Sequence, residues 1–125
     1  MAIRDFRDLL IWQRAMDVAR IVYRITESFP SSELYGLTSQ LRRAAVSVPS
    51  NIAEGHGRES EREFGRFLRI SRGSLAELQT QLILAEGLGY AGADSFLEIN
   101  ELIEELGRMM RGMQKALDSQ LTTLD

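Results

Sequence analysis

The sequence predicts an all-α fold: a single domain, residues 1–125, forming an up-down-up-down antiparallel four-helix bundle whose second helix is kinked at Pro49. Three observations predict it. Apolar residues recur at alternating spacings of three and four in four segments, which is the period of one helix face. The breaks between segments are short, so each helix must run antiparallel to the previous one. The composition, with 44% hydrophobic, 26% charged and 7% aromatic residues and two prolines, suits one soluble helical domain.

The first segment covers roughly residues 8–27 and ends before Pro30, because a proline cannot continue a helix. Ser31 or Ser32 can then cap the second helix. The apolar seam of the first segment is expected to consist of Trp12, Met16, Ala19, Val22 and Thr26.

The second segment covers roughly residues 33–54, with the seam Leu37, Leu41, Ala45, Val48 and Ile52. Pro49 lies inside it and removes one backbone donor, which costs about 3 kcal/mol in a regular helix. Since the seam continues past Pro49, we expect one kinked helix, with Ser47 helping to satisfy the carbonyl group that is left free. The glycines on either side of His56 are expected to end this helix and to place His56 in the turn.

The third segment begins at Ser60 and Glu63, which have the spacing of a capping box. Its seam is Phe64, Leu68, Ser71, Leu75, Leu78, Leu82 and Ala85. The glycine-rich stretch GLGYAGA separates it from the fourth segment, whose seam is Ile99, Ile103, Leu106, Met110, Met113 and Leu117. Such regular seams predict helices that pack lengthwise.

A row of polar residues borders the apolar seam on the second helix and continues on the third. We call it the polar border; its members are Gln40, Arg43, Ser47, Asn51 and Glu54 on the second helix and Ser74, Glu77 and Gln81 on the third. Antiparallel pairing of the two helices is expected to bring Gln40 level with Ser74. Polar side chains in this position form hydrogen bonds across a helix pair or contact another subunit. The sequence leaves both interpretations open.

The stretches IWQRA, SQLRRAAVSVPSNIAEGHGR and FGRFLRISRGSLAELQTQLILAEGLGY resemble the 23S rRNA intervening-sequence proteins, a four-helix bundle family sometimes labelled as ribosomal proteins. The resemblance covers nearly the whole chain and is most specific over residues 47–55 and at Gly73, Ser74, Leu75 and Glu77. It implies a small bacterial bundle that assembles into a homopentamer and has no established enzymatic activity. A related bundle is similar to the accessory protein of diversity-generating retroelements, which binds nucleic acid and a reverse transcriptase.

Arginine accounts for 14 of the 15 basic residues, although the net charge of the chain is −3. Between positions 42 and 72, seven arginines and four glutamates leave a local charge of +3. The candidates for contacts with a phosphate backbone are Arg58, Arg62, Arg66, Arg69 and Arg72. The alternative is a solvated face whose arginines pair with the glutamates between them, and no aromatic residue interleaves with the stripe.

Catalytic and metal-binding patterns are missing from the sequence. There is no cysteine, and one histidine, His56, cannot supply the Glu-x-x-His pairs of di-iron bundles or the His-Glu-x-x-His of zinc proteases. We therefore expect no catalytic residue, no metal and no cofactor, and we interpret Met109, Met110 and Met113 as core residues. The charged start MAIRDFRDLL and the lack of a spanning apolar segment predict a cytoplasmic protein without a membrane partner.

The leading hypothesis is a non-enzymatic homo-oligomer, a pentamer on the resemblance, that acts as a scaffold or adaptor. Its subunit contacts would involve Gln40, Arg43, Ser47, Asn51, Glu54, Ser74 and Glu77. The alternative is a module that binds RNA or DNA through the arginine stripe of the third helix.

Overall fold

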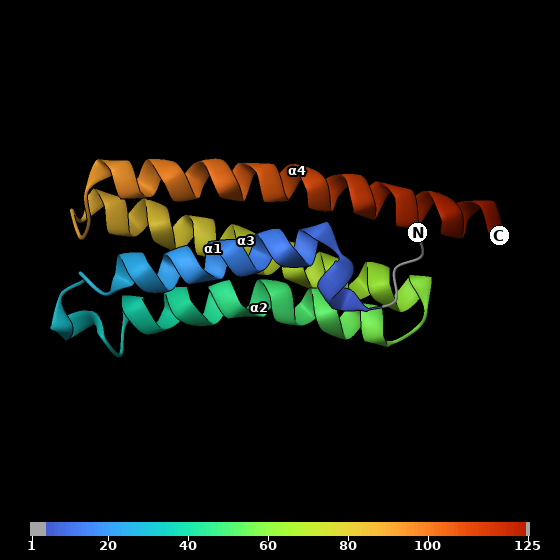
Figure 1. The fold of residues 1–125 in the computed structure, drawn as a ribbon, viewed down its shortest axis with the longest axis horizontal. Coiled ribbons are helices and arrows are strands. Elements are labelled where there is room, and N and C mark those ends of the chain that lie inside the picture. Colours follow the sequence, from blue (N-terminus) through green and yellow to red (C-terminus); the bar gives the residue numbers. More distant parts are fainter. Residues whose placement is uncertain (1–4, 125) are drawn as a thin grey trace.

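The computed structural model describes residues 5–124, with the side chains of residues 5–120, and the regular secondary structure of this part of the chain is all helical (Figure 1). The α-helices are α1 (Leu10–Thr26), α2 (Leu37–Gly57), α3 (Glu61–Gly87) and α4 (Ala93–Leu124). Two short 3-10 turns, η1 (Phe6–Asp8) and η2 (Ser31–Glu33), precede α1 and α2.

The four helices lie side by side around one core. Helix α1 packs against α2 and α4, and α3 packs against the same two neighbours, so the helices occupy the corners of a square. The α1–α2 and α3–α4 connections lie at one end of the bundle and the α2–α3 turn lies at the other (Figure 1). This arrangement confirms the antiparallel four-helix bundle that the spacing predicts.

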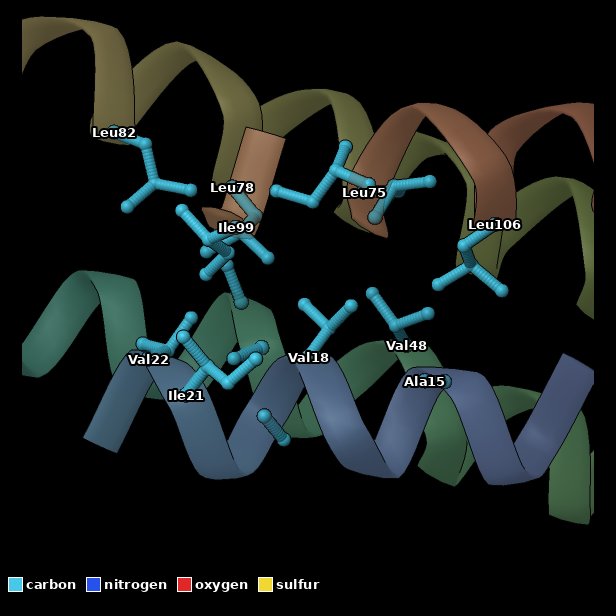
Figure 2. Close-up of a cluster of buried hydrophobic side chains, with 14 of the residues drawn as sticks. Ala15, Val18, Ile21, Val22, Val48, Leu75, Leu78, Leu82, Ile99 and Leu106 are labelled. Atoms are coloured by element: carbon cyan, nitrogen blue, oxygen red, sulfur yellow. The ribbon is translucent and has the colours of Figure 1, made fainter. Parts of the chain in front are cut away.

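The core consists of aliphatic side chains contributed by all four helices. Figure 2 shows Val18 and Val22 of α1 pointing toward Leu78 of α3 and Ile99 of α4. The predicted seam of α2 is buried throughout, and in α4 only Met113 of the predicted seam is half-buried. In α3, Phe64 is half-buried, whereas Phe67 is buried in its place.

In the predicted seam of α1, Ala19, Val22 and Thr26 are buried, and the other two residues lie toward α2. The residues that α1 buries include Ile11, Ala15, Val18, Val22 and Ile25, whereas Trp12 and Met16 are half-buried. Because α1 packs against both α2 and α4, its buried arc is wider than one seam and is centred on Val18 and Val22. Trp12 and Met16 lie at the α2 edge of this arc.

Helix α2 begins later than predicted and is not capped by a serine. Ser31 and Ser32 lie in η2, and α2 starts at Leu37. A glutamate performs the capping instead: the Leu37 backbone N–H donates to Glu33 Oε1 at 3.1 Å, and the Tyr90 hydroxyl donates to Glu33 Oε2 at 2.7 Å. The bond from Tyr90, followed by the bond from the Leu37 N–H, lowers the pKa of Glu33, and the same Tyr90–Glu33 bond raises the pKa of Tyr90. Glu33 thus joins the two connections at this end of the bundle.

Helix α2 ends at the second of the two glycines around His56, three residues later than predicted, and the placement of His56 in the turn is wrong. Helix α2 continues to Gly57, so His56 lies in its last turn with its ring edge-on to Phe64 at 6.0 Å. Gly55 instead permits a close approach, because a Cβ there would lie 2.7 Å from Phe67 Cβ. The turn occupies residues 58–60 and contains Glu59 at a φ of 56°.

Helix α3 starts with half of the predicted capping box. The Glu63 backbone N–H donates to Ser60 Oγ at 3.3 Å, as predicted. The Glu63 carboxylate does not return to Ser60; it accepts from Arg66 Nε at 2.9 Å. An ion pair therefore replaces the second half of the motif.

Helix α2 runs through Pro49 without a break, as predicted, and the bend at this residue stays a prediction. The expectation that Ser47 satisfies the freed carbonyl is wrong, because its hydroxyl bonds to Ser74. A second helix braces this region: the buried Ser71 hydroxyl of α3 donates to the Val48 carbonyl at 2.7 Å.

Candidate functional site

The polar border joins α2 to α3 within one chain. The hydroxyl groups of Ser47 and Ser74 lie 2.8 Å apart, within hydrogen-bond distance. Asn51 Nδ2 donates to the Ser47 carbonyl at 2.8 Å and to its hydroxyl at 3.0 Å. Three of the predicted interface residues therefore hydrogen-bond to one another within a single chain.

The register of this border differs from the prediction. Ser74 faces Ser47, not Gln40, and Gln40 Oε1 accepts from Gln81 Nε2 at 3.5 Å. The shift arises because α2 continues to Gly57, so that the chain reverses direction three residues later than the glycines suggest. Gln81 also donates to Glu77 Oε1 at 3.3 Å.

The remaining interface candidates reach the surface. Arg43 and Glu77 are exposed, and the exposed Glu54 forms an ion pair with Arg58 at 3.0 Å. The border thus has an inner row that holds two helices together and an outer row that faces solvent.

A groove follows the outer side of the α1–α2 pair, next to the polar border. It consists of two hollows of about 540 and 610 Å³ that share Tyr23 and Val46. We call it the α1–α2 groove; its apolar lining is Trp12, Met16, Ala19, Tyr23, Leu34, Tyr35, Val46, Pro49 and Ala53. Its basic lining is Arg20, Arg42 and Arg43, and Ser47 also reaches it.

Large apolar side chains of the α1–α2 groove are open to solvent. Tyr35 is 94% exposed, Tyr23 is 44% exposed and Val46 is 43% exposed. The Arg42 guanidinium lies 4.6 Å from the Tyr23 ring centroid and donates to Thr26 Oγ1 at 2.9 Å, which fixes one wall. Sequence reasoning missed this groove, although Tyr23 and Val46 stand outside every predicted seam and could have indicated a second apolar face.

A second group of exposed apolar side chains lies where α3 ends and α4 begins. We call it the acidic end; its apolar members are Ile83, Leu84, Leu88 and Leu97, which are 51–62% exposed. Exposed acidic side chains surround them in the sequence: Glu86, Asp94, Glu98 and Glu101. Residues 73–107 contain no lysine or arginine, so this part of the chain is negatively charged.

Ion pairs occupy most of the predicted arginine stripe of α3. Arg66 pairs with Glu63 at 2.9 Å, and Arg69 pairs with Asp118 of α4 at 2.8 Å. Arg58, which pairs with Glu54, and Arg66 also lie 5.0 and 4.5 Å from the ring centroid of Phe67. Among the residues the structure describes, Arg62 and Arg72 have no ion-pair partner.

Arg72 lies in a groove of about 700 Å³ between α3 and α4, which the sequence did not reveal. Four arginines line this α3–α4 groove: Arg69, Arg72, Arg108 and Arg111. One acidic side chain, Glu104, and the apolar Leu75, Ala76 and Ile103 also line it. Arg108 and Arg111 stand 35 or more positions after the α3 stripe, so only the pairing of the helices brings them beside Arg72.

Within residues 5–120 no three His, Cys, Asp or Glu side chains are grouped as metal ligands would be. None of the helices in the described part of the chain combines the length and the apolar character that crossing a bilayer requires.

The chain is similar to a crystal structure from Bacteroides thetaiotaomicron, described as a protein with unknown function from the S23 ribosomal protein family. The two share 20% identity with a TM-score of 0.76 over 85% of this chain and 99% of the other, which shows a common fold. None of the curated proteins matches the chain. The model of the 23S rRNA-intervening sequence protein family matches residues 7–112, and this chain therefore belongs to that family.

Proposed function

We propose that this protein acts by assembly and not by catalysis, as a homo-oligomeric scaffold whose copies join head to tail. In this proposal the α1–α2 groove of one copy receives the acidic end of the next. The observation that carries the proposal is the α1–α2 groove itself, since contiguous exposed apolar surface on a small bundle marks an interaction site.

The polar border contributes to this proposal through its outer row only. Ser47, Asn51 and Ser74 bond to one another within one chain, so these bonds do not need a neighbour. Arg43 is exposed and lines the α1–α2 groove, where it can contact a second copy. The contact surface that we propose is thus centred on the α1–α2 groove, whereas the predicted one was centred on the polar border between α2 and α3.

A second copy is the favoured occupant because this chain carries a complementary surface. The α1–α2 groove is apolar with three arginines, and the acidic end is apolar with several exposed carboxylates. Apolar contact stabilises such an interface, and opposite charges orient it. Two different surfaces make a heterologous contact, and heterologous contacts close into a ring when the rotation between copies returns to the first one. A ring of five copies is the assembly that the family resemblance implies.

Size-exclusion chromatography with light scattering tests this proposal. The wild-type chain is expected to elute as a closed oligomer. Val46→Glu places a carboxylate in the α1–α2 groove, and Leu97→Glu places one in the acidic end, so each variant alone is expected to be monomeric. Mixed in equal amounts, each variant supplies the surface that the other lacks. The mixture should therefore form a 1:1 pair and nothing larger.

Ala116→Glu, an exposed position on α4 outside both surfaces, is the matched control and should assemble like the wild type. Ile70, which is 43% exposed like Val46 and lies one turn before Ser74 on α3, tests the polar border directly. If Ile70→Glu dissociates the oligomer and Val46→Glu does not, the contact is at the border. A monomeric wild-type chain at micromolar concentration contradicts assembly altogether.

A further inference from the structure

The α3–α4 groove concentrates positive charge in a protein of net negative charge. Four arginines and one glutamate line it, whereas the whole chain carries −3. Arg69 is engaged by Asp118, but in the described part of the chain Arg72, Arg108 and Arg111 form no ion pair. Unpaired guanidinium groups gathered from two helices create a local field that attracts anions.

The shape of the groove distinguishes it from a solvated charge stripe. A glycine lies in each wall, Gly73 on α3 and Gly107 on α4. A Cβ at Gly73 would meet no atom within 4 Å, which leaves that side open to a ligand. A Cβ at Gly107 would lie 3.2 Å from Arg111 Nη1, so the absence of a side chain there lets the Arg111 guanidinium rest against the wall.

From this geometry we propose that the α3–α4 groove binds phosphate groups, with Arg72, Arg108 and Arg111 as the residues that hold them. Guanidinium groups bind phosphate oxygens through paired N–H donors, which is why arginine is preferred at phosphate sites. Arg72 approaches from α3 and the other two from α4, so the three can contact more than one phosphate. A phosphodiester chain and a small oligophosphate both present this chemistry.

This site is separate from the assembly surfaces. The α3–α4 groove lies between helices on the side of the bundle opposite the α1–α2 pair. None of its lining residues belongs to the α1–α2 groove or to the acidic end. Binding of phosphate and self-assembly can therefore be tested independently, and one can fail without the other.

Fluorescence anisotropy with a labelled 12-nucleotide single-stranded RNA and a DNA of the same sequence tests the backbone source. Calorimetric titration with inorganic pyrophosphate tests whether the ligand is a small oligophosphate. Binding of either probe supports the proposal and identifies the source. Affinity for the RNA should fall as salt is added. In a plot of log affinity against log salt concentration, each arginine contact should make the slope more negative by roughly 0.7.

Two variants connect binding to the groove. Arg108→Gln with Arg111→Gln should weaken binding by about tenfold or more, and the salt dependence should become correspondingly shallower. Gly107→Ala keeps every charge but displaces the Arg111 guanidinium, so it should weaken binding by a smaller factor. Arg62→Gln, an exposed α3 arginine outside the groove, is the matched control and should bind like the wild type.

Three outcomes overturn the proposal. The first is the absence of RNA, DNA and pyrophosphate binding at low salt. The second is a loss in log affinity per substituted arginine that is the same for Arg62→Gln and for the double variant, which would indicate diffuse attraction. The third is binding of poly-glutamate as tight as that of RNA, which would make the partner an acidic peptide. Circular dichroism of each variant confirms that the bundle is folded.

Discussion

Gly55 is the residue at which α2 and α3 depend on the lack of a side chain. In Gly55→Ala the new Cβ would lie 2.7 Å from Phe67 Cβ and 3.3 Å from a ring carbon of Phe64, so one helix must move. We expect a loss of about 1–3 kcal/mol in the free energy of unfolding, the usual range for overpacking. Denaturant titration measures it.

Gly57 provides the control for this prediction, because it lies two residues later in the same helix. A Cβ there meets nothing within 4 Å, so Gly57→Ala should stabilise by up to about 1 kcal/mol through helix propensity alone. Equal effects of the two substitutions would show that the contact with Phe67 is unimportant.

The paired hydroxyls of Ser47 and Ser74 are a second test at the scale of single residues. Their 2.8 Å contact should give a coupling of about 0.5–1.5 kcal/mol in a double-mutant cycle of alanine variants. Ser50, exposed on α2 and facing the α1–α2 groove, supplies the comparison, because its cycle with Ser74 should give a coupling near zero. Coupling of the same size in both cycles would contradict a specific bond.

At the scale of elements, Glu33 ties the start of α2 to the α3–α4 connection, and this contact depends on pH. Its two hydrogen bonds hold the folded-state pKa below the ordinary 4.5, so their stabilisation is complete above pH 4.5 and is lost as pH falls through the lower folded value. For Tyr90 the raised pKa has the opposite sign: stabilisation is complete below pH 10.0 and is lost as pH rises further.

The melting temperature measured as a function of pH reports both the acid and the alkaline loss of stability. Glu33→Gln should reduce the loss of melting temperature below pH 4.5, because an amide does not titrate: its oxygen can accept from the Leu37 N–H, and its NH2 group can donate to the Tyr90 hydroxyl. Tyr90→Phe should remove the alkaline loss that starts near pH 10.0. Glu86→Gln, at an exposed position, is the control. If the melting temperatures of the Glu86 and Glu33 variants fall identically below pH 4.5, the hydrogen bonds of Glu33 do not cause the acid loss of stability.

The sequence predicts which segments are helical, but it does not predict the residues at which α2 begins and ends. The seam from Leu37 to Ile52 repeats with the helical period whichever neighbour it meets, so the periodicity alone identifies it. The end of α2 depends on a tertiary contact: Gly55 and Gly57 resemble a stop signal, but Gly55 is required by Phe67 of the next helix. The start of α2 likewise depends on Glu33 and on Tyr90, which is distant in the sequence.

At the scale of the whole molecule, a single-helix pattern cannot reveal surfaces built from two helices. The spacing of Trp12 and Met16 fits one helix and predicts a core seam, but both residues also line a surface hollow together with Val46 of α2. Arg108 and Arg111 form no notable stripe of their own and become a site only beside Arg72. The residue types were visible in the sequence, and the helix pairing that combines them was not.

Trp12 allows the assembled molecule to be followed without a label. It is the one tryptophan of the chain and lines the α1–α2 groove, where it is half-buried. If a second copy covers this groove, the fluorescence emission of Trp12 should shift to longer wavelength on dilution, because dissociation of the oligomer exposes the ring to water. Val46→Glu should show the long-wavelength emission at every concentration. Leu97→Glu should do so too, although its substitution is in a different surface, because head-to-tail assembly needs both. A mass that falls on dilution while the Trp12 emission stays constant would place the subunit contact elsewhere.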